Sequence, residues 1–265
     1  MTSLYAIYKQ TGDKKYLNFI DGFVDYYVFE DGSIRGYELE TYNVDNLNEG
    51  RVLFDLYRET GKEKYKKAID LLHRQIIGQP RTGKGNFWHK KIYPNQVWLD
   101  GLYMAQVFYV RYETEFNRGI NYADIVSQFK NVYENMYDKE KKLYYHGWDY
   151  SKEAFWADKE TGLSKSFWLR AIGWYTVGLV DAIGYFGKNA PNFKTELITL
   201  FRKTIAGLES YIDPETHMFW QVVDQIGREG NYPETSGSAM IAYAMMKGAR
   251  LGYVEKRFAK VGEEV

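Results

Sequence analysis

The chain contains no cysteine, only five prolines and only four histidines among its 265 residues. Without cysteine it has no disulfide, no thiolate metal site and no cysteine nucleophile. The histidines lack the HExxH spacing of zinc proteases, and the phosphate-binding GxxxxGKS/T, dinucleotide-binding GxGxxG and serine-hydrolase GxSxG patterns are missing as well. We therefore expect neither a metal ion nor another cofactor.

Net charge and long apolar runs are also lacking. The chain has 35 Lys and Arg against 35 Asp and Glu, so it offers no basic surface to nucleic acid or to a membrane. No apolar run reaches the roughly 18 residues of a membrane span, and the residues after Met1 do not resemble a signal peptide. We expect a cytoplasmic protein that binds neither nucleic acid nor a membrane.

Aromatic residues, by contrast, are abundant at 18% of the chain, and hydrophobic residues reach 45%. This apolar content is enough to fill the core of one large domain or two small ones. The aromatic residues outnumber those that a helical core alone requires. We therefore expect some of them to serve a binding function.

An internal repeat with a period of 49 residues predicts helical hairpins. The segment LYAIYKQTGDKKYL at 4–17 returns as LFDLYRETGKEKYK at 53–66. Each copy predicts a helix that ends at a Gly and is followed by a second helix with apolar residues at helical spacing. Further helices are predicted over 97–115, 121–136, 167–186, 192–211 and 236–252. The scarcity of proline and of alternating β-branched runs argues against a substantial sheet.

Four long segments rich in Gly, Asn and aromatic residues separate these hairpins: 29–44, 78–96, 137–166 and 212–235. Loops of this length inside a compact domain usually carry function. Each loop precedes the first helix of a hairpin, so hairpins stacked in a ring would bring all four loops to one end. We expect the functional site at that end.

Asp100 lies in GNFWHKKIYPNQVWLDGLYM (85–104), which also contains His89, Trp98 and Met104 and leads into a helix. An acid in the first helical turn is favoured by the unpaired amides and the helix dipole, so position alone favours a structural role for Asp100. Asp45 opens the helix that begins 55 positions earlier. In a ring of hairpins the two carboxylates would meet across the mouth.

A second aromatic stretch spans residues 143–175 and contains His146, Trp148, Trp156, Trp168, Arg170 and Trp174. Trp168, Arg170 and Trp174 cannot share one narrow helical stripe, so at least one of them should face the loops. Tryptophan stacks on the apolar face of a pyranose, and carboxylates exchange protons with glycosidic or vinyl-ether atoms. Paired carboxylates beside tryptophans therefore suggest sugar chemistry.

A third stretch, NYPETSGSAM at 231–240, places Glu234, Thr235 and Ser236 at a helix start. Helix capping is the favoured interpretation of these residues. Ser236 is a poor nucleophile candidate because the GxSxG elbow is missing.

These motifs together resemble the unsaturated rhamnogalacturonyl hydrolases of glycoside hydrolase family 105. The matching pieces follow the family's order along nearly the whole chain: the block from Tyr42 to Arg51, QPRTGKGNFWHK, YPNQVWLDGLYM, YYHGWDYS, WADKETG, FWLRAIGWY and NYPETSGSAM. The resemblance implies an all-α fold, an (α/α)6 toroid of helical hairpins, in the cytoplasm and without metal. It also implies pectin-derived substrates whose terminal uronyl residue carries a C4=C5 double bond.

The resemblance further implies that the enzyme hydrates this double bond. Asp100 matches the acid that protonates C4 and assists the addition of water at C5, after which the hemiketal collapses and the neighbouring sugar leaves. Asp45 matches a second acid that orients sugar and water. The family's sugar-binding positions correspond to His89, Met104, His146, Trp168, Arg170, Trp174 and Thr235. Arg170 or His146 is expected to hold the substrate carboxylate.

Some features depart from the family pattern. Residues 1–265 are expected to form one incomplete barrel domain that lacks an N-terminal piece and the last hairpin. Leu169 and Ile172 occupy positions where smaller or more polar residues are expected to line a sugar subsite. An open ring would expose apolar helix faces, so we expect a homodimer or poor solubility.

Two other functions remain open. An unsaturated glucuronyl hydrolase would share the toroid and the chemistry but act on glycosaminoglycan fragments; QPRTGKGNFWHK favours the pectin side. A sugar-binding relic with an incomplete, inactive barrel is the alternative from a different functional class.

Overall fold

The computed structural model describes all 265 residues and consists mainly of helical hairpins. The first hairpin pairs α1 (Thr2–Thr11) with α2 (Lys14–Tyr27), and the second pairs α4 (Arg51–Thr60) with α5 (Glu63–Gly78). Gly12 and Gly61 end α1 and α4 in the left-handed conformation, with φ of 71° and 67°. The structure thus confirms the repeated hairpin and its glycine stops.

The remaining helices follow the predicted order. The short η1 (Leu39–Thr41) and α3 (Asp45–Glu49) precede α4, and the predicted helix over 97–115 consists of α6 (Leu99–Gly101), a π-helical turn η2 (Leu102–Gln106) and α7 (Val107–Phe116). Then come α8 (Tyr122–Met136), α9 (Leu169–Tyr185), α10 (Pro191–Glu209), α11 (Thr235–Arg250) and α12 (Arg257–Glu264). None of these helices has both the length and the apolar character needed to cross a membrane.

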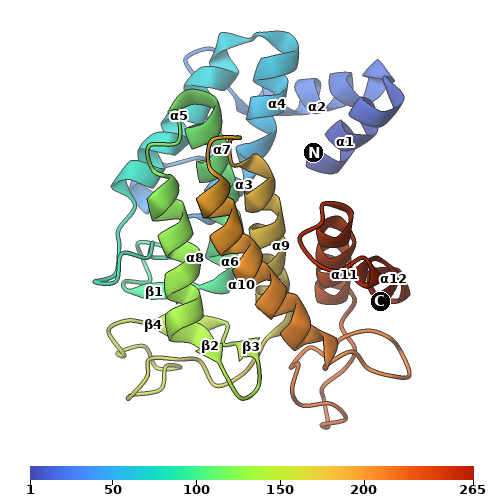
Figure 1. Cartoon of the computed structure of the whole chain (residues 1–265). Coiled ribbons are helices and arrows are strands. Elements are labelled where there is room, and N and C mark those ends of the chain that lie inside the picture. Colours follow the sequence, from blue (N-terminus) through green and yellow to red (C-terminus); the bar gives the residue numbers. More distant parts are fainter.

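The strands are few and short, as predicted. The strand β1 (Gln96–Trp98) pairs antiparallel with β4 (Gly147–Asp149), and β2 (Tyr137–Asp138) pairs with β3 (Leu143–Tyr144). The β1–β4 pair connects the loop before α6 with the loop before α9. In Figure 1 both lie at the lower end of the molecule.

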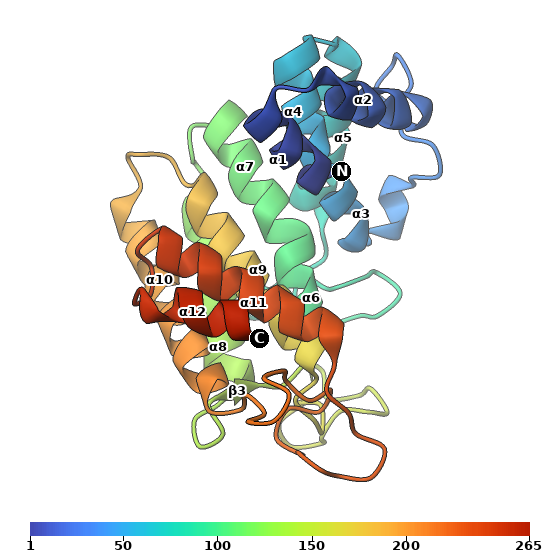
Figure 2. The ribbon, with the colours of Figure 1, turned by 90° about the vertical axis from the view of Figure 1, so that its right-hand side faces the viewer.

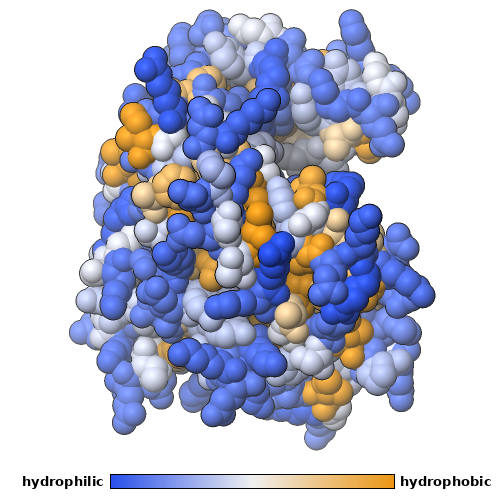
Figure 3. All heavy atoms as spheres, in the orientation of Figure 1, coloured by the Kyte–Doolittle hydropathy of each residue, from blue (hydrophilic) through white to orange (hydrophobic).

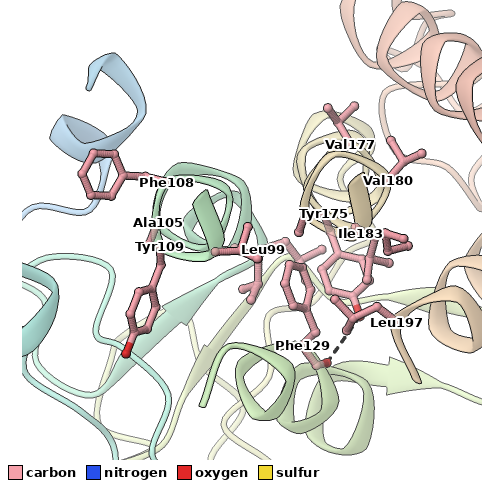
Figure 4. Close-up of a cluster of buried hydrophobic side chains, with 14 of the residues drawn as sticks. Leu99, Ala105, Phe108, Tyr109, Phe129, Tyr175, Val177, Val180, Ile183 and Leu197 are labelled. Atoms are coloured by element: carbon pink, nitrogen blue, oxygen red, sulfur yellow. Dashed lines mark hydrogen bonds between the residues drawn. The ribbon is translucent and has the colours of Figure 1, made fainter. Parts of the chain in front are cut away.

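The helix α9 lies at the centre of the arrangement, in contact with α7, α10 and α11 (Figures 1 and 2). Most of its residues are buried because helices cover it on several sides. Figure 4 shows Tyr175 of α9 beside Phe129 of α8, with Leu197 of α10 next to them; Val177 and Val180 lie on the other side of α9. The core is thus built around α9.

The burial of α9 corrects one expectation. Leu169 and Ile172 have no exposed surface, and Leu169 packs against Gly237 at the start of α11. They contribute to the core and do not line a sugar subsite. The apolar character of these two positions therefore follows from helix packing.

A polar cluster centred on the buried Asp181 joins three helices. Asp181 of α9 accepts hydrogen bonds from Arg51 of α4 at 3.0 Å, and from Tyr243 and Lys247 of α11 at 3.0 and 2.7 Å. Arg51 also lies over the ring of Tyr103, 4.6 Å from its centroid. Pairing compensates these buried charges and fixes the inner helices relative to one another.

Three of the four long loops, those after α5, α8 and α10, lie next to one another as predicted, whereas the loop 29–44 lies beside α2 and α3 and meets the other loops only near its end, at Asn43 (Figure 2). Isolated β-bridges join Asn43 to Lys90 and Trp168 to Val222, and the β1–β4 pair supplies the link between them. The loops after α5, α8 and α10 all lie at the lower end in Figure 1. The hairpins therefore bring segments that are distant in sequence to one end of the molecule.

Candidate active site

Asp100 is held at the loop end by the turn from β1 into α6. The strand β1 ends at Trp98, opposite Gly147 of β4. The next residue, Leu99, is fully buried, and its N–H donates to the carbonyl of His146 at 3.0 Å. This backbone hydrogen bond and the buried Leu99 side chain fix the first turn of α6, and hence the position of Asp100.

The Asp100 carboxyl group lies in surroundings that favour its protonated form. Its Oδ2 atom is buried and makes no hydrogen bond within the protein. Burial raises the pKa of Asp100 above its ordinary value of 3.8, against the opposing influence of His89 and His146. A carboxyl group of this kind can donate a proton at a pH where an exposed aspartate cannot.

Asp45 lies in the opposite environment. The side chain of Asn43 accepts a hydrogen bond from the Asp45 N–H at 3.0 Å, which fixes the start of α3. The Asp45 carboxylate is 3.2 Å from Nε2 of His89 and 2.9 Å from Nζ of Lys90. Burial alone would raise the pKa of Asp45, but the hydrogen bonds and charges of His89 and Lys90 together lower it to about 2.

The two carboxyl groups influence one another, since the charge of Asp45 contributes to the raised pKa of Asp100. Their surroundings shift the two pKa values in opposite directions. Such divergence is typical of acid–base pairs in enzymes, where one carboxyl group gives a proton and the other remains an anion. The geometry thus brings together Asp100 and Asp45, the two catalytic residues predicted from the sequence.

Stacked rings form one wall of the candidate site. His89 stacks on Trp98 with a centroid distance of 4.5 Å, and Tyr93 stacks on the same indole at 5.4 Å. A Cβ atom at Gly101 would lie 3.0 Å from Nδ1 of His89, so only glycine lets the helix pass this close to the imidazole. The stacked rings and the close approach of Gly101 hold the His89 imidazole next to the Asp45 carboxylate.

The opposite wall comes from the β4 segment and the start of α9. His146 meets the edge of Trp168 at 5.9 Å between centroids, and burial lowers the pKa of His146. The guanidinium group of Arg170 lies 4.7 Å from the centroid of Trp168 and is solvent-exposed. Trp168 and Trp174 are each half-buried. The structure confirms that Trp168, Arg170 and Trp174 do not share one buried stripe.

The remaining predicted residues lie on the helices around this site. Met104 belongs to the π-helical turn η2, while Trp174 packs against Tyr103 of the same turn at 4.8 Å. Thr235 is exposed at the start of α11. Glu234 caps this helix by accepting from the N–H groups of Ser236 and Gly237, which confirms the capping interpretation of this stretch.

Three contacts near the site were not predicted from the sequence. Lys90 is an ion-pair partner of Asp45, and its place directly after His89 in the FWHK motif was the signal that could have revealed it. Trp156 packs on Gly147, within reach of His146. Tyr103 lies between Arg51 and Trp174, which no local pattern indicates. No group of three or more His, Asp or Glu side chains is arranged to hold a metal ion.

Comparisons with known proteins identify the family and the fold of the chain. The family model described as Glycosyl Hydrolase Family 88 matches residues 1–264. A family 105 glycoside hydrolase structure from C. acetobutylicum ATCC 824 superimposes with a TM-score of 0.95 at 45% identity, covering 98% of this chain and 72% of that one. The likeness confirms the expected all-α toroid fold.

Two curated relatives add to this result. Unsaturated rhamnogalacturonyl hydrolase YesR of Bacillus subtilis is 27% identical over 266 residues, which cover 97% of this chain and 72% of YesR. A 24.9 kDa protein in the picA locus of Rhizobium radiobacter is 39% identical over 118 residues, 44% of this chain and 49% of that protein. The match thus spans about half the length of the Rhizobium relative.

The family match over nearly the whole length and the 45% identity to a family 105 structure agree with the resemblance found in the motifs. The chain therefore belongs to the glycosyl hydrolases of family 88 as the family model describes them, and among these to glycoside hydrolase family 105.

Proposed function

We propose that this chain is a hydrolase that removes the terminal 4,5-unsaturated uronyl residue from rhamnogalacturonan oligosaccharides. The observation that carries the proposal is the pair of carboxyl groups at the loop end. Asp100 has a raised pKa and a buried, unpaired oxygen, whereas Asp45 has a pKa of about 2 and is held by His89 and Lys90. One group is suited to give a proton, and the other to remain an anion.

Asp100 begins the reaction by donating its proton to C4 of the sugar. The electron pair of the C4=C5 bond forms the new C4–H bond, and positive charge develops at C5, where the ring oxygen stabilises it. A water molecule adds at C5 and gives a proton back to the Asp100 carboxylate. Asp100 is then protonated again, and C5 carries the hydroxyl group of a hemiketal.

The glycosidic bond breaks as a consequence of this hydration. The hemiketal opens to a ketone at C5, which leaves C1 as a hemiacetal that still carries the neighbouring sugar. Collapse of the hemiacetal yields an aldehyde at C1 and frees that sugar with its own hydroxyl group. One water molecule is consumed, and the double bond is lost.

The aromatic and polar side chains around the two carboxyl groups are proposed to bind the substrate. The ring of Trp168 offers a platform for a pyranose, and the exposed Arg170 beside it can hold the uronate carboxylate through charge-assisted hydrogen bonds. Asp45 accepts from a sugar hydroxyl or from the attacking water. His89, His146, Trp174, Met104 and Thr235 complete the proposed sugar contacts.

The pectin-derived substrate has specific support. YesR, at 27% identity, bears the name unsaturated rhamnogalacturonyl hydrolase, and the solved relative at 45% identity is a family 105 enzyme. The unsaturated glucuronyl hydrolases, including one specific for heparin, share 14–17% identity and therefore support the fold alone.

A substrate panel tests the proposal. Unsaturated rhamnogalacturonan and chondroitin disaccharides are incubated with equal amounts of enzyme, and the loss of ultraviolet absorbance is followed. We expect turnover of the rhamnogalacturonan disaccharide. Preference for chondroitin fragments would instead indicate a glucuronyl hydrolase. Binding of the sugar by folded protein without any turnover would indicate the inactive relic.

A further inference from the structure

A small cavity lies beside the His89–Trp98 stack, and both residues contribute to its lining. It has a volume of about 10 Å³, and its lining includes Trp88, His89, Gly101 and Gln106. About 10–15 Å³ of such space is what one buried water molecule requires, provided that two to four polar groups surround it. The cavity therefore has room for a single water.

Three buried polar atoms on the lining residues make no hydrogen bond within the protein. They are Nε1 of Trp88, Nδ1 of His89 and Oε1 of Gln106. His89 and Gln106 are only 3% and 1% exposed, so bulk solvent does not reach these atoms. Leaving such groups unpaired in the protein interior is unfavourable, so a bound partner is expected. Three residues that line one water-sized cavity thus each carry an unpaired polar atom, which is the pattern expected of a water site.

We propose that this cavity binds one structural water and that Gln106 and Trp88 are positioning residues that act through it on His89. Because Nε2 of His89 faces the Asp45 carboxylate and donates to it, Nδ1 is left as an acceptor, and the three groups then suit one arrangement of this water. Trp88 Nε1 only donates, so the water accepts from it, and Gln106 Oε1 only accepts, so the water donates one O–H to it. The second O–H points to His89 Nδ1.

This arrangement matches the tautomer of His89 that Asp45 requires. Nε2 lies 3.2 Å from the acceptor carboxylate of Asp45 and carries the imidazole proton, and the water reinforces this tautomer by donating to Nδ1. A histidine held in this tautomer donates to Asp45 and keeps the carboxylate oriented beside Asp100. Metal-bound histidines behave similarly, because the ring nitrogen that does not bind the metal makes a hydrogen bond to a second group, and this bond sets the tautomer and the ring orientation.

Gln106, which lines the cavity, belongs to the π-helical turn. Turns of this kind occur mostly as single interruptions of α-helices and are frequent at functional sites. Here η2 spans Leu102–Gln106 directly after Asp100, and Gln106 is its last residue. The same turn thus carries both Gln106, which lines the cavity beside His89, and Met104, which is one of the proposed sugar contacts.

Two direct measurements test the water itself. A high-resolution crystal structure should show a density peak within hydrogen-bond distance of the three atoms. Nitrogen NMR of histidine-labelled protein should show His89 protonated at Nε2 and accepting at Nδ1; with only four histidines, single substitutions assign the signal. A well-ordered cavity without density, or a His89 protonated at Nδ1, would overturn the proposal.

Kinetics test the positioning role, which rests on the proposed function. Gln106→Leu and Trp88→Phe should each lower kcat about threefold to tenfold with little change in KM, since each removes one hydrogen bond to the water. If both act through one water, the double variant should be no slower than the slower single variant. Additive losses, or unchanged kcat in both single variants, would contradict the role.

Thr204→Val is the matched control. Thr204 is a buried side chain of α10 that hydrogen-bonds to the Leu200 carbonyl, remote from the cavity. It should lower the melting temperature while kcat stays unchanged, which separates lost stability from lost positioning. If the wild-type protein turns over no unsaturated sugar, the proposed function fails, whereas the density peak and the His89 signal still decide the water site.

Discussion

Asp100 and Asp45 show how surroundings give two identical side chains different roles. Asp100 is placed in a buried position where its charge is disfavoured, and Asp45 is placed against the imidazole of His89 and the ammonium group of Lys90. Burial makes Asp100 useful as an acid, and the same burial costs stability whenever Asp100 is ionised. Function and stability should therefore respond in opposite directions when this carboxyl group is removed.

We predict that Asp100→Asn lowers kcat at least about 100-fold, because proton transfer to C4 is lost. It should also raise the melting temperature at pH 7. The folded-state pKa of Asp100 lies above the ordinary 3.8, so its favourable contribution exists below pH 3.8 and disappears as the pH rises through the raised pKa. Asparagine avoids the cost of the buried charge.

Asp213→Asn provides a contrast for the same melting measurement. Hydrogen bonds from Trp220 and from the N–H of Thr216 lower the pKa of Asp213 to about 2, so its ionised form is stabilising at pH 7. This variant should melt at a lower temperature than the wild type. An Asp100→Asn protein that is less stable than the wild type at pH 7, or that keeps its turnover, would contradict the role of Asp100.

The pH profile of kcat/KM should reflect both carboxyl groups. Activity requires an ionised Asp45 and a protonated Asp100, so it should fall at acid pH as Asp45 gains a proton and at higher pH as Asp100 loses one. Lys90→Gln removes a charge that lowers the pKa of Asp45, so the acid limb should move to higher pH. Lys91→Gln alters the neighbouring residue, which makes no contact with Asp45, and should leave that limb in place. Equal acid limbs in both variants would refute the assignment.

At the residue scale, the sequence identified the candidate acids but could not supply the physical basis of their roles. Position alone favoured Asp100 as a helix-start acid, since its burial depends on loops that are distant in the sequence. Lys90 was missed because a lysine in a loop is usually solvated. The antiparallel bridge between Asn43 and Lys90 brings it beside Asp45, and this pairing joins segments that are distant in the sequence.

At the scale of elements, the glycine-stopped hairpins were predictable because their signals are local. The π-helical turn was not, since the apolar spacing over 97–115 is compatible with an unbroken α-helix. The burial of Leu169 and Ile172 was also missed. It follows from the neighbours of α9, which a single helical pattern does not specify.

The repeated hairpins supply a matched pair of glycine substitutions. Gly61 and Gly12 have similar positive φ values, and no atom lies within 4 Å of the position that an added methyl group would occupy at either residue. Alanine therefore brings the same backbone strain and no clash at both sites. Gly61→Ala should lower the global free energy of unfolding by about 1 to 2 kcal/mol. Helix α4 contributes six buried residues, whereas α1 has none.

Gly12→Ala should therefore loosen α1 locally without changing global stability. Denaturant unfolding measures the global effect, and hydrogen exchange of the α1 amides measures the local one. Equal global losses for the two variants would show that α1 unfolds together with the rest of the molecule.

At the scale of the whole molecule, the stacking of hairpins and the meeting of the loops after α5, α8 and α10 could be predicted, because hairpins of similar length leave their loops on one side. How the molecule covers its apolar surface was less predictable. Figure 3 shows apolar side chains over the face below the α1–α2 hairpin, where the surface is hollowed. An apolar pocket of about 370 Å³ lies there, lined in part by Phe23, Tyr27 and Ile34.

We predict that this face makes the chain self-associate. A cluster of aromatic side chains on and after α2 is 39–62% exposed: Phe19, Phe23, Tyr26, Tyr27 and Phe29. Contiguous apolar patches of this kind usually mark interaction surfaces. Sedimentation equilibrium should show a dimer, and the double variant Phe23→Ser, Tyr27→Ser should shift it to the monomer. Phe155→Ser, at an isolated exposed ring, should leave the dimer intact; a monomeric wild type would contradict the prediction.

We propose that this protein breaks a glycosidic bond by hydrating a double bond. The most direct measurement follows ultraviolet absorbance and released sugar together, with an unsaturated rhamnogalacturonan disaccharide and the wild-type protein. We expect the absorbance to fall in step with sugar release, and both to cease in Asp100→Asn. Release of the neighbouring sugar with the absorbance retained would show direct glycosidic cleavage and contradict the account.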